Sequence, residues 1–443
     1  MPYTPHTEED VKSMLATIGV NSIDDLFIEI PAELRIKGEL NIPSAMSEHA
    51  LFLHMASLAS QNVNATSVDW YLGAGLYDRF IPASVRAVIS RGEFLTAYTP
   101  YQPEMSQGYL QTIYEFQSMI AELYGMDLAN ASMYDGSTSM AEAAVMATGM
   151  TDRNKIVVST GVHPRYREVL KTYCWAQSLE YSEIDTADGL TSDYSGVDDS
   201  SACIIVQSPN FFGQIEDLGE TRKIADQTGA IMVTVADPVA MALLKPPGEF
   251  GSDIVVGEAQ PMGVAMGYGG PLVGLFATSK ANVRKIPGRI VGKTHDAAGR
   301  KGYAMTLRTR EQDIRREKAT SNICTNEALM ALASTVYMAA LGKNGMKSIA
   351  ESSARNSHYA AEKLCEAGGK MRFGGKYFTE FVVDCNKNAS EVRDTLLGAG
   401  IMAGLPLGEF YPELENCLLV ATTEVRTKAQ IDRFAMEFGK AIR

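Results

Sequence analysis

The sequence predicts a doubly wound α/β protein with a smaller α+β unit at its C-terminus. Continuous apolar runs such as Cys203–Val206 indicate strands buried on both faces, as in a mainly parallel sheet covered by helices. Helical segments alternate with these runs through the middle of the chain. With 443 residues, the chain is long enough for two or three domains around a large core.

The first 65 residues predict an N-terminal arm of short helices. Thr7 suits the N-cap of a first helix that Gly19 ends, and Ser22 begins a second, shorter helix. Pro31 and Pro43 punctuate the remainder, which has no strand pattern.

A large α/β domain is predicted over residues 66–325. Apolar residues at helical spacing mark Tyr109–Tyr124, which Gly125 ends, and the alanine-rich segment Ser137–Thr148 predicts a second helix. The predicted strands are Lys155–Ser159, Ser178–Glu183, Ala202–Gln207, Ile231–Ala236, Asp253–Val256 and Leu272–Ala277.

A small α+β domain is predicted over residues 326–443. It begins with a strongly apolar helix and ends with a helix that Thr427 caps. Its predicted elements are helix Asn326–Leu341, strand Tyr377–Asp384, helix Ser390–Leu397, strand Cys417–Thr422 and a final helix from Lys428.

Composition narrows the classes of function. A net charge of −13 argues against nucleic acid as a partner, because binding phosphates needs a basic surface. No apolar stretch approaches the roughly 18 residues of a membrane helix, and residues 1–10 lack the features of a signal peptide. The six cysteines never lie two residues apart, so we expect free thiols, no metal site and a cytoplasmic protein.

The proline-rich stretch Ala97–Gly108 is the most unusual in the chain. Its prolines restrict the backbone and predict a rigid loop that presents Tyr98, Tyr101, Gln102 and Glu104. Such a loop suits a binding site, but it is also consistent with a turn whose tyrosines only pack.

Gly136 and Ser137 precede a predicted helix within Tyr134–Met140. Free N–H groups at a helix start can bind phosphate, although ordinary helix capping is the favoured interpretation of this pattern.

The segment Arg284–Lys318 holds eleven Lys or Arg and four Asp or Glu, a local charge of +7. It is either a solvated surface or a site for an anionic partner. Ser321 and Asn322 follow in Ala319–Thr325, where polar side chains suit either a substrate carboxylate or helix capping.

The order of strand ends resembles the large domain of enzymes that use pyridoxal 5'-phosphate (PLP). In those enzymes an aspartate at a strand end holds the pyridinium nitrogen, and a lysine one strand later binds the cofactor. Asp237 stands at such a strand end, and His163 follows a strand where a group over the ring is often found. No lysine lies between Lys245 and Lys280, where one is expected.

Several long motifs together resemble the glycine dehydrogenase (decarboxylating) family, the P-protein of the glycine cleavage system. The resemblance covers essentially the whole chain and implies the type I fold of PLP-dependent transferases. The motifs are Tyr71–Tyr77, Tyr98–Glu104, Val256–Gly263, Arg316–Thr325 and Thr422–Thr427.

In this family the enzyme is one long chain or two subunits, and the second half carries the PLP-binding lysine. The resemblance places Pro261 near that lysine position, so this chain resembles subunit 1, with PLP carried by subunit 2. The implied reaction is decarboxylation of glycine and transfer of the aminomethyl group to the lipoyl arm of the H-protein. The implied assembly holds two copies of each subunit.

The resemblance also implies roles for individual residues. Tyr98, Tyr101, Gln102 and Glu104 are expected to reach the partner's site as catalytic residues. Ser321 and Asn322 are expected to bind substrate there, and the segment Arg284–Arg316 to help dock the H-protein. Asp237 and Ser137 are possible relics of cofactor binding.

Two alternatives stay open at this point. One is a stand-alone PLP enzyme, such as an aminotransferase, that uses a lysine elsewhere, with Lys245 and Lys280 flanking the expected position. The other is a non-catalytic structural subunit whose site loops are relics.

Overall fold

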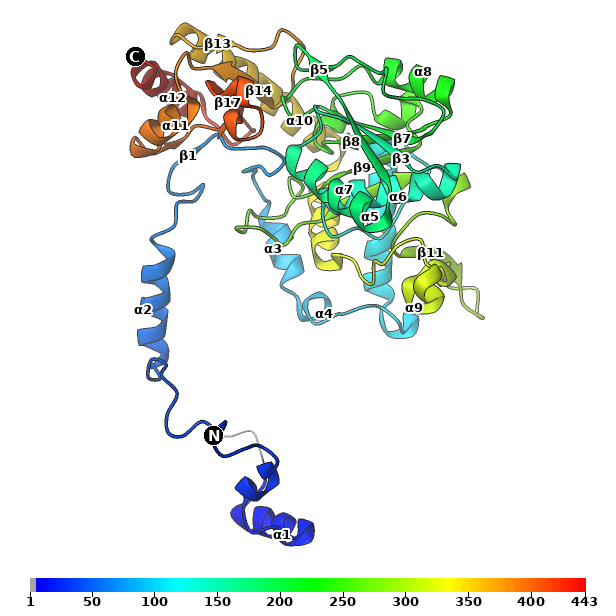
Figure 1. Ribbon diagram of the computed structural model, residues 1–443, viewed down its shortest axis with the longest axis vertical. Helices are drawn as coiled ribbons and strands as arrows, with labels where there is room; N and C mark the ends of the chain where they lie inside the picture. The colour runs from blue at the N-terminus through cyan, green and yellow to red at the C-terminus, as the bar shows by residue number, and fades with distance from the viewer. Residues whose placement is uncertain (1–4) are drawn as a thin grey trace. The chain divides into compact units, whose positions relative to one another are not determined.

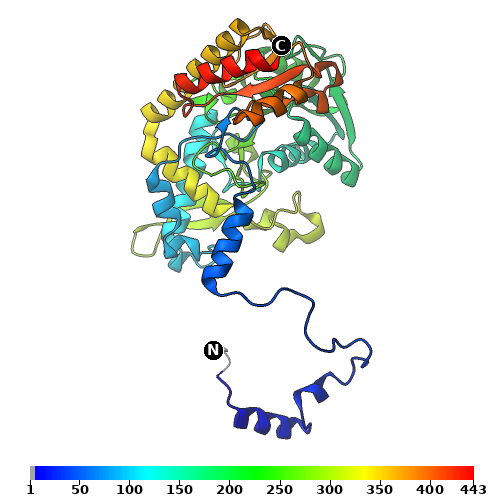
Figure 2. The same ribbon diagram turned by 90° about the vertical axis from the view of Figure 1, so that its left-hand side faces the viewer.

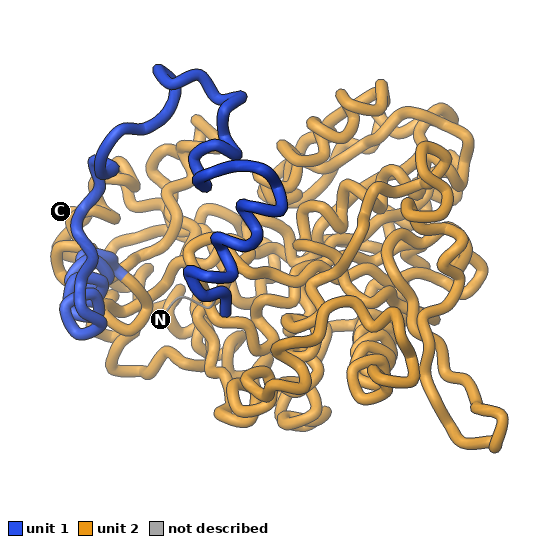
Figure 3. Tube along the Cα trace, turned by 90° about the horizontal axis from the view of Figure 1, so that it is seen from below, with its two compact units in different colours: residues 1–63 blue, residues 64–443 orange. Residues whose placement is uncertain are grey.

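The chain divides into two compact units, residues 1–63 and 64–443. Figure 1 shows the computed structural model, which describes residues 5–443, and Figure 3 colours the two units separately. Residues 1–4 lie outside the described residues. They begin both the predicted N-terminal arm and the segment 1–10, which was predicted not to be a signal peptide.

The first unit contains the predicted short helices. Helix α1 (Glu8–Ile18) begins with a capping box, in which the Thr7 hydroxyl accepts from the Asp10 N–H and the Asp10 carboxylate accepts from the Thr7 N–H. Gly19 ends it in the left-handed region, at φ 86°. A 3₁₀ helix follows Ser22 at Ile23–Phe27, and helix α2 (Glu48–Ala59) has no counterpart among the predicted elements.

The second unit is built on a seven-stranded sheet in the order β2-β10-β9-β8-β7-β3-β4. Strands β9, β8, β7, β3 and β4 run parallel, and β10 is antiparallel to β9 and β2. All six predicted strands are present, so the mainly parallel sheet is confirmed. Their bounds are β3 (Lys155–Ser159), β4 (Glu180–Ile184), β7 (Ser201–Ser208), β8 (Ile231–Ala236), β9 (Ile254–Glu258) and β10 (Gly274–Thr278), with β2 at Leu128–Ala129.

Helices cover both faces of this sheet, because alternate strand residues point to opposite sides. Ile156, Ile205 and Val256 pack in one core with α6 and α7. Val255 and Leu275 pack on the other face with α5 and α10. The helices are α3 (Ala83–Ile89), α4 (Gly92–Leu95), α5 (Gln107–Tyr124), α6 (Gly136–Thr151), α7 (Pro164–Gln177), α8 (Leu218–Thr228), α9 (Gln312–Arg315) and α10 (Ala328–Glu366).

A four-stranded antiparallel sheet forms the C-terminal part, in the order β13-β14-β17-β16. Helices α11 (Ala389–Gly398) and α12 (Lys428–Ala441) pack on it with the second half of α10, and Figure 2 shows α12 in red and α11 in orange beside these strands. The strands are β13 (Lys370–Met371), β14 (Glu380–Asp384), β16 (Leu405–Pro406) and β17 (Cys417–Ala421).

Two features differ from the predicted elements. Strands β11 (Ile290–His295) and β12 (Lys301–Thr306) form a hairpin inside the basic segment, for which no strand is predicted. Helix α10 continues well beyond Leu341, although Gly342 interrupts it with a non-helical backbone at φ 59°. The shorter predicted helix therefore corresponds to the part before this interruption.

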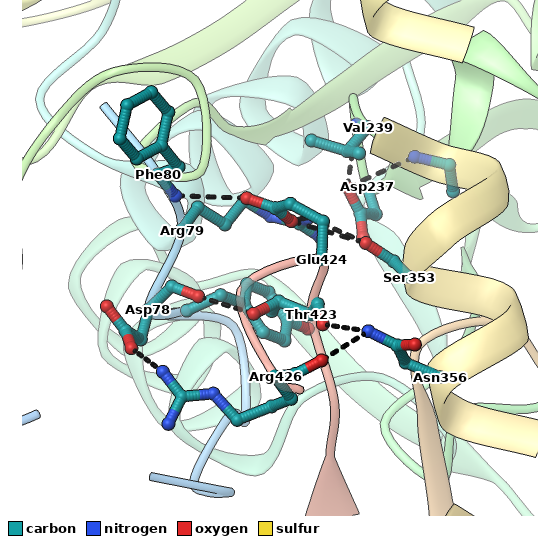
Figure 4. A network of polar contacts seen from close by, with 12 residues as sticks. Asp78, Arg79, Phe80, Asp237, Val239, Ser353, Asn356, Thr423, Glu424 and Arg426 are labelled. Carbon is teal, nitrogen blue, oxygen red and sulfur yellow. Dashed lines mark hydrogen bonds and ion pairs between the residues drawn. The ribbon is translucent and has the colours of Figure 1, made fainter. Parts of the chain in front are cut away.

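A buried polar network ties the start of the second unit to its C-terminal part (Figure 4). Arg79 forms a 2.6 Å ion pair with Glu424 and donates to Ser353 on α10 at 3.0 Å. Arg426 pairs with Asp78 at 2.5 Å. The motif Thr422–Thr427 thus connects the C-terminal part of the second unit to the segment that contains Asp78 and Arg79.

No helix within residues 5–443 is long and apolar enough to cross a membrane.

Candidate functional site

A small cavity lies beyond the ends of the parallel strands, where open α/β sheets bind their ligands. Its volume is about 50 Å³, well below the roughly 300–1,000 Å³ of ligand pockets. We call it the sheet-edge cavity. Its lining includes Tyr77, His163, Tyr166, Asp237, Glu258, Pro261 and Glu380.

Glu258 ends strand β9 and is buried beside this cavity. Its carboxylate accepts hydrogen bonds from the backbone N–H groups of Gly136 (3.0 Å), Gln260 (2.9 Å) and Val273 (3.0 Å). Burial raises the pKa of Glu258 to about 7 although these bonds oppose the rise. The carboxylate therefore holds three separate backbone segments together.

Asp237 follows strand β8, at the strand-end position expected from the sequence. Its carboxylate accepts from the N–H groups of Val239 (2.8 Å) and Ala240 (3.4 Å), which makes it a local turn cap. Burial raises its pKa, and the charge of Arg79 opposes that rise.

His163 also lines the cavity and is fixed in place by three contacts. Its Nε2 lies 3.0 Å from the carbonyl oxygen of Ala74, and its Nδ1 accepts from the Arg165 N–H at 3.1 Å. The ring stacks on Tyr166 with 4.9 Å between centroids. Burial lowers the pKa of His163 to about 4, so the imidazole is neutral at pH 7.

PLP does not fit the residues present here. Residues 246–279 contain no lysine, and Pro261 lines the cavity instead. The Gly136 N–H, at the start of α6 where a cofactor phosphate would bind, donates to Glu258. Ser137 donates to the Asp135 carboxylate at 2.8 Å, which is the arrangement of a capped helix.

The structure brings two segments that are distant in the sequence together around Arg289, just before β11. This guanidinium is buried and donates to the hydroxyls of Thr99 (2.9 Å) and Tyr101 (3.2 Å). It also donates to the Cys324 carbonyl oxygen (2.6 Å) and the Thr325 hydroxyl (3.3 Å). We call this group the Arg289 cluster.

The ring of Tyr101 contacts two cations in this cluster. The guanidinium carbons of Arg289 and Arg308 lie 5.5 Å and 5.3 Å from the centre of its ring. Glu311 balances the charge, with an oxygen 3.6 Å from Arg289 Nε. Tyr101 is 49% exposed and yet held by both arginines, as a preorganised contact surface would be.

The other predicted residues of the proline-rich loop are exposed beside Tyr101. Tyr98 is 76% exposed, Gln102 precedes the 3₁₀ helix Pro103–Met105, and Glu104 lies within it. The structure thus brings one of the four, Tyr101, into the cluster.

Ser321 and Asn322 line a separate pocket of about 350 Å³. The pocket also contains Glu142 of α6, which is buried, and Tyr173 of α7. Burial raises the pKa of Glu142 to about 7, and a hydrogen bond with Ser321 opposes the rise. Glu142 and Arg289 were not predicted from the sequence, since neither stands in a motif of its own.

Comparison with known proteins shows which family the chain is similar to. The family model for the glycine cleavage system P-protein matches residues 1–438. Probable glycine dehydrogenase (decarboxylating) subunit 1 of Bacillus cytotoxicus is 52% identical over 440 residues, which cover 99% of this chain and 98% of that protein. The subunit 1 chains of Bacillus cereus reach the same identity and coverage.

Solved structures agree with this similarity. The crystal structure of glycine decarboxylase (P-protein) of the glycine cleavage system, in an inhibitor-bound form, has a TM-score of 0.92, 41% identity and full coverage of both chains. Sphingosine-1-phosphate lyase of Burkholderia pseudomallei, at 13% identity and a TM-score of 0.68, covering 93% of this chain and 94% of its own, shares the fold alone. The fold is that of PLP-dependent transferases of type I, as the resemblance implied, and the chain belongs to the glycine cleavage system P-protein family.

Proposed function

We propose that this chain is the non-PLP-binding subunit of a two-subunit glycine decarboxylase. Together with subunit 2 it decarboxylates glycine and transfers the aminomethyl group to the lipoyl arm of the H-protein. Its full-length similarity to subunit 1 chains supports this proposal. The observation that carries it is the meeting of the proline-rich loop, the basic segment and residues 324–325 at Arg289.

PLP, which provides an electron sink for decarboxylation, is carried by subunit 2 in this proposal. Two observations support the assignment: the sheet-edge cavity is small, and no lysine lies in residues 246–279. The residues of this chain then act by binding and orienting. In type I enzymes active sites lie between subunits, so a fixed surface on one chain can complete the site of the other.

The Arg289 cluster supplies that surface. Tyr101 presents its ring toward the partner while Arg289 holds its hydroxyl, and the exposed side chains of Tyr98, Gln102 and Glu104 lie on the same loop. Ser321 and Asn322 are proposed to contact the substrate. We further propose that Arg284–Arg316 docks the H-protein, that the complex holds two copies of each subunit, and that it is cytoplasmic.

Co-purification tests the proposal most directly. The chain is co-expressed with the PLP-carrying subunit, and release of CO₂ from glycine is measured with and without this chain. Activity of subunit 2 alone at the level of the pair would contradict the proposal. A visible absorbance band of lysine-bound PLP from the isolated chain would favour a stand-alone PLP enzyme instead.

Substitution of Tyr101 by Phe tests its hydroxyl within the complex. We expect slower glycine–bicarbonate exchange, because the aromatic ring loses the bond that fixes it to Arg289. The matched control is Trp175→Phe, an aromatic change at a residue of α7 that is 82% exposed. Equal exchange rates for both variants would exclude a role for the Tyr101 hydroxyl.

A further inference from the structure

The start of helix α6 binds a carboxylate from its own chain. Gly136 is the first residue of this 16-residue helix, and its N–H donates to Oε2 of Glu258 at 3.0 Å. The free N–H groups and the dipole of a helix start attract anions. Glu258 brings such a charge from strand β9, 122 residues away in the sequence.

Oε1 of Glu258 is also fully engaged. It accepts from the N–H groups of Gln260 (2.9 Å) and Val273 (3.0 Å), so both carboxylate oxygens are fixed by backbone donors. The residue is 7% exposed. A buried carboxylate with three backbone donors has the hydrogen bonding of a bound anion rather than of a surface acid.

Tyr166 of α7 also packs against the start of helix α6. Its hydroxyl lies directly against Gly136, so that a Cβ atom at residue 136 would overlap it. Gly75, His163, Tyr166 and Glu258 line both the sheet-edge cavity of about 50 Å³ and a neighbouring cavity of about 250 Å³. The two cavities therefore adjoin at these four residues, beside the start of α6.

We propose that Glu258 is an internal anion, which occupies the place of a ligand phosphate at the start of α6 and keeps this chain free of phosphate-bearing cofactors. The absence of a lysine would prevent only a covalent bond to PLP. Glu258 acts earlier, because a phosphate entering this place would meet a negative charge and would find its Gly136 donor taken. The inference concerns the isolated chain and does not depend on the proposed decarboxylase activity.

The test measures binding of inorganic phosphate to the full-length chain at pH 8 by isothermal titration calorimetry. The variants are Glu258→Ala, which opens the place, and Glu258→Gln, which keeps the size of the side chain and removes its charge. We expect the Ala variant to bind phosphate at least about tenfold more tightly than the wild type, which corresponds to about 1.4 kcal/mol. The Gln variant should show a smaller gain, because it removes the charge but its amide still fills the place. The Gln variant keeps the test decisive if the Ala variant does not fold.

Three controls separate the possible sources of binding. Glu249→Ala removes an exposed negative charge elsewhere and should leave phosphate binding unchanged. PLP should gain affinity with the Glu258 variants, whereas pyridoxal, which lacks the phosphate, should not. Wild-type binding as tight as that of the variants, or folded variants that bind no tighter, would overturn the proposal. Neither result would affect the subunit assignment, which co-purification tests.

Discussion

The guanidinium group of Arg289 donates a 3.2 Å hydrogen bond to the hydroxyl of Tyr101, a residue 188 positions earlier in the chain. The same group holds Cys324 and Thr325. One buried cation therefore fixes the relative position of two motifs that lie far apart in the sequence.

Replacing Arg289 should loosen that arrangement. Arg289→Met leaves Glu311 in a buried position without its nearest cation, and we expect the free energy of unfolding to fall by about 3 kcal/mol. Arg289→Lys keeps the charge but loses the planar fork of donors, so the expected loss is about 2 kcal/mol. Urea denaturation of the purified chain measures both.

The Arg289→Lys variant also tests the link between this cluster and activity. In the complex with subunit 2 we expect glycine–bicarbonate exchange to slow by about tenfold, because a misplaced contact residue costs rate. Arg355→Lys, at an exposed position of α10 and outside the proposed docking segment, is the matched control. If the Arg289→Lys complex assembles and exchanges at the wild-type rate, that result would argue against this role.

Glu142 predicts a pH dependence of stability. Its pKa is raised to about 7 in the folded chain from an ordinary value of 4.5. Between these values the folded chain holds a proton that the unfolded chain has released, so the free energy of unfolding falls as the pH rises. Titration of Glu142 therefore lowers the free energy of unfolding by about 3 kcal/mol between pH 4.5 and pH 8.

Glu142→Gln cannot titrate and should remove that contribution. Denaturation at a series of pH values should therefore show the variant gaining about 3 kcal/mol relative to the wild type as the pH rises from about 4.5 to 8. Glu122→Gln, at an exposed position of α5, should run parallel to the wild type. A parallel profile for Glu142→Gln would contradict the prediction.

Alanine substitutions at Gly213 and Gly299 can distinguish the cost of backbone strain from the cost of a steric overlap. Both have left-handed backbones, with φ of 82° and 78°, but a Cβ at Gly213 would overlap the backbone carbonyl oxygen of Glu380, whereas Gly299 has no atom within 4 Å. Gly299→Ala should cost about 1 kcal/mol for strain alone. Gly213→Ala should cost about 3 kcal/mol or more, because the two segments must also move apart. Similar losses in thermal stability would exclude the packing contribution.

Much of the sheet could be predicted from local patterns. Strands β3 and β8 have the predicted bounds, because both are short apolar runs between turn residues. The capping boxes at Thr7 and Thr427 are local as well, since each bond spans three residues. Such elements depend on neighbours in the sequence and are visible without the fold.

The missed features depend on contacts between distant residues. Gln107 of α5 accepts a hydrogen bond from the N–H of Tyr303 in β12, which positions the hairpin. No local sequence pattern predicts this contact. Arg289 is one of many cations in its segment, and only its burial distinguishes it. Asp237 was identified as a strand-end residue, but its bonds to Val239 and Ala240 became known from the structure.

Helix α10 links two hydrophobic cores of the second unit. Tyr337 and Met346 belong to the core beside the seven-stranded sheet, and Ala360 and Leu364 belong to the core of the small sheet. A fragment that ends before residue 328 would lack α10, which covers the core beside the seven-stranded sheet. We therefore expect the stabilities of the large and small predicted domains to be coupled, so that neither is stable when cut from the other.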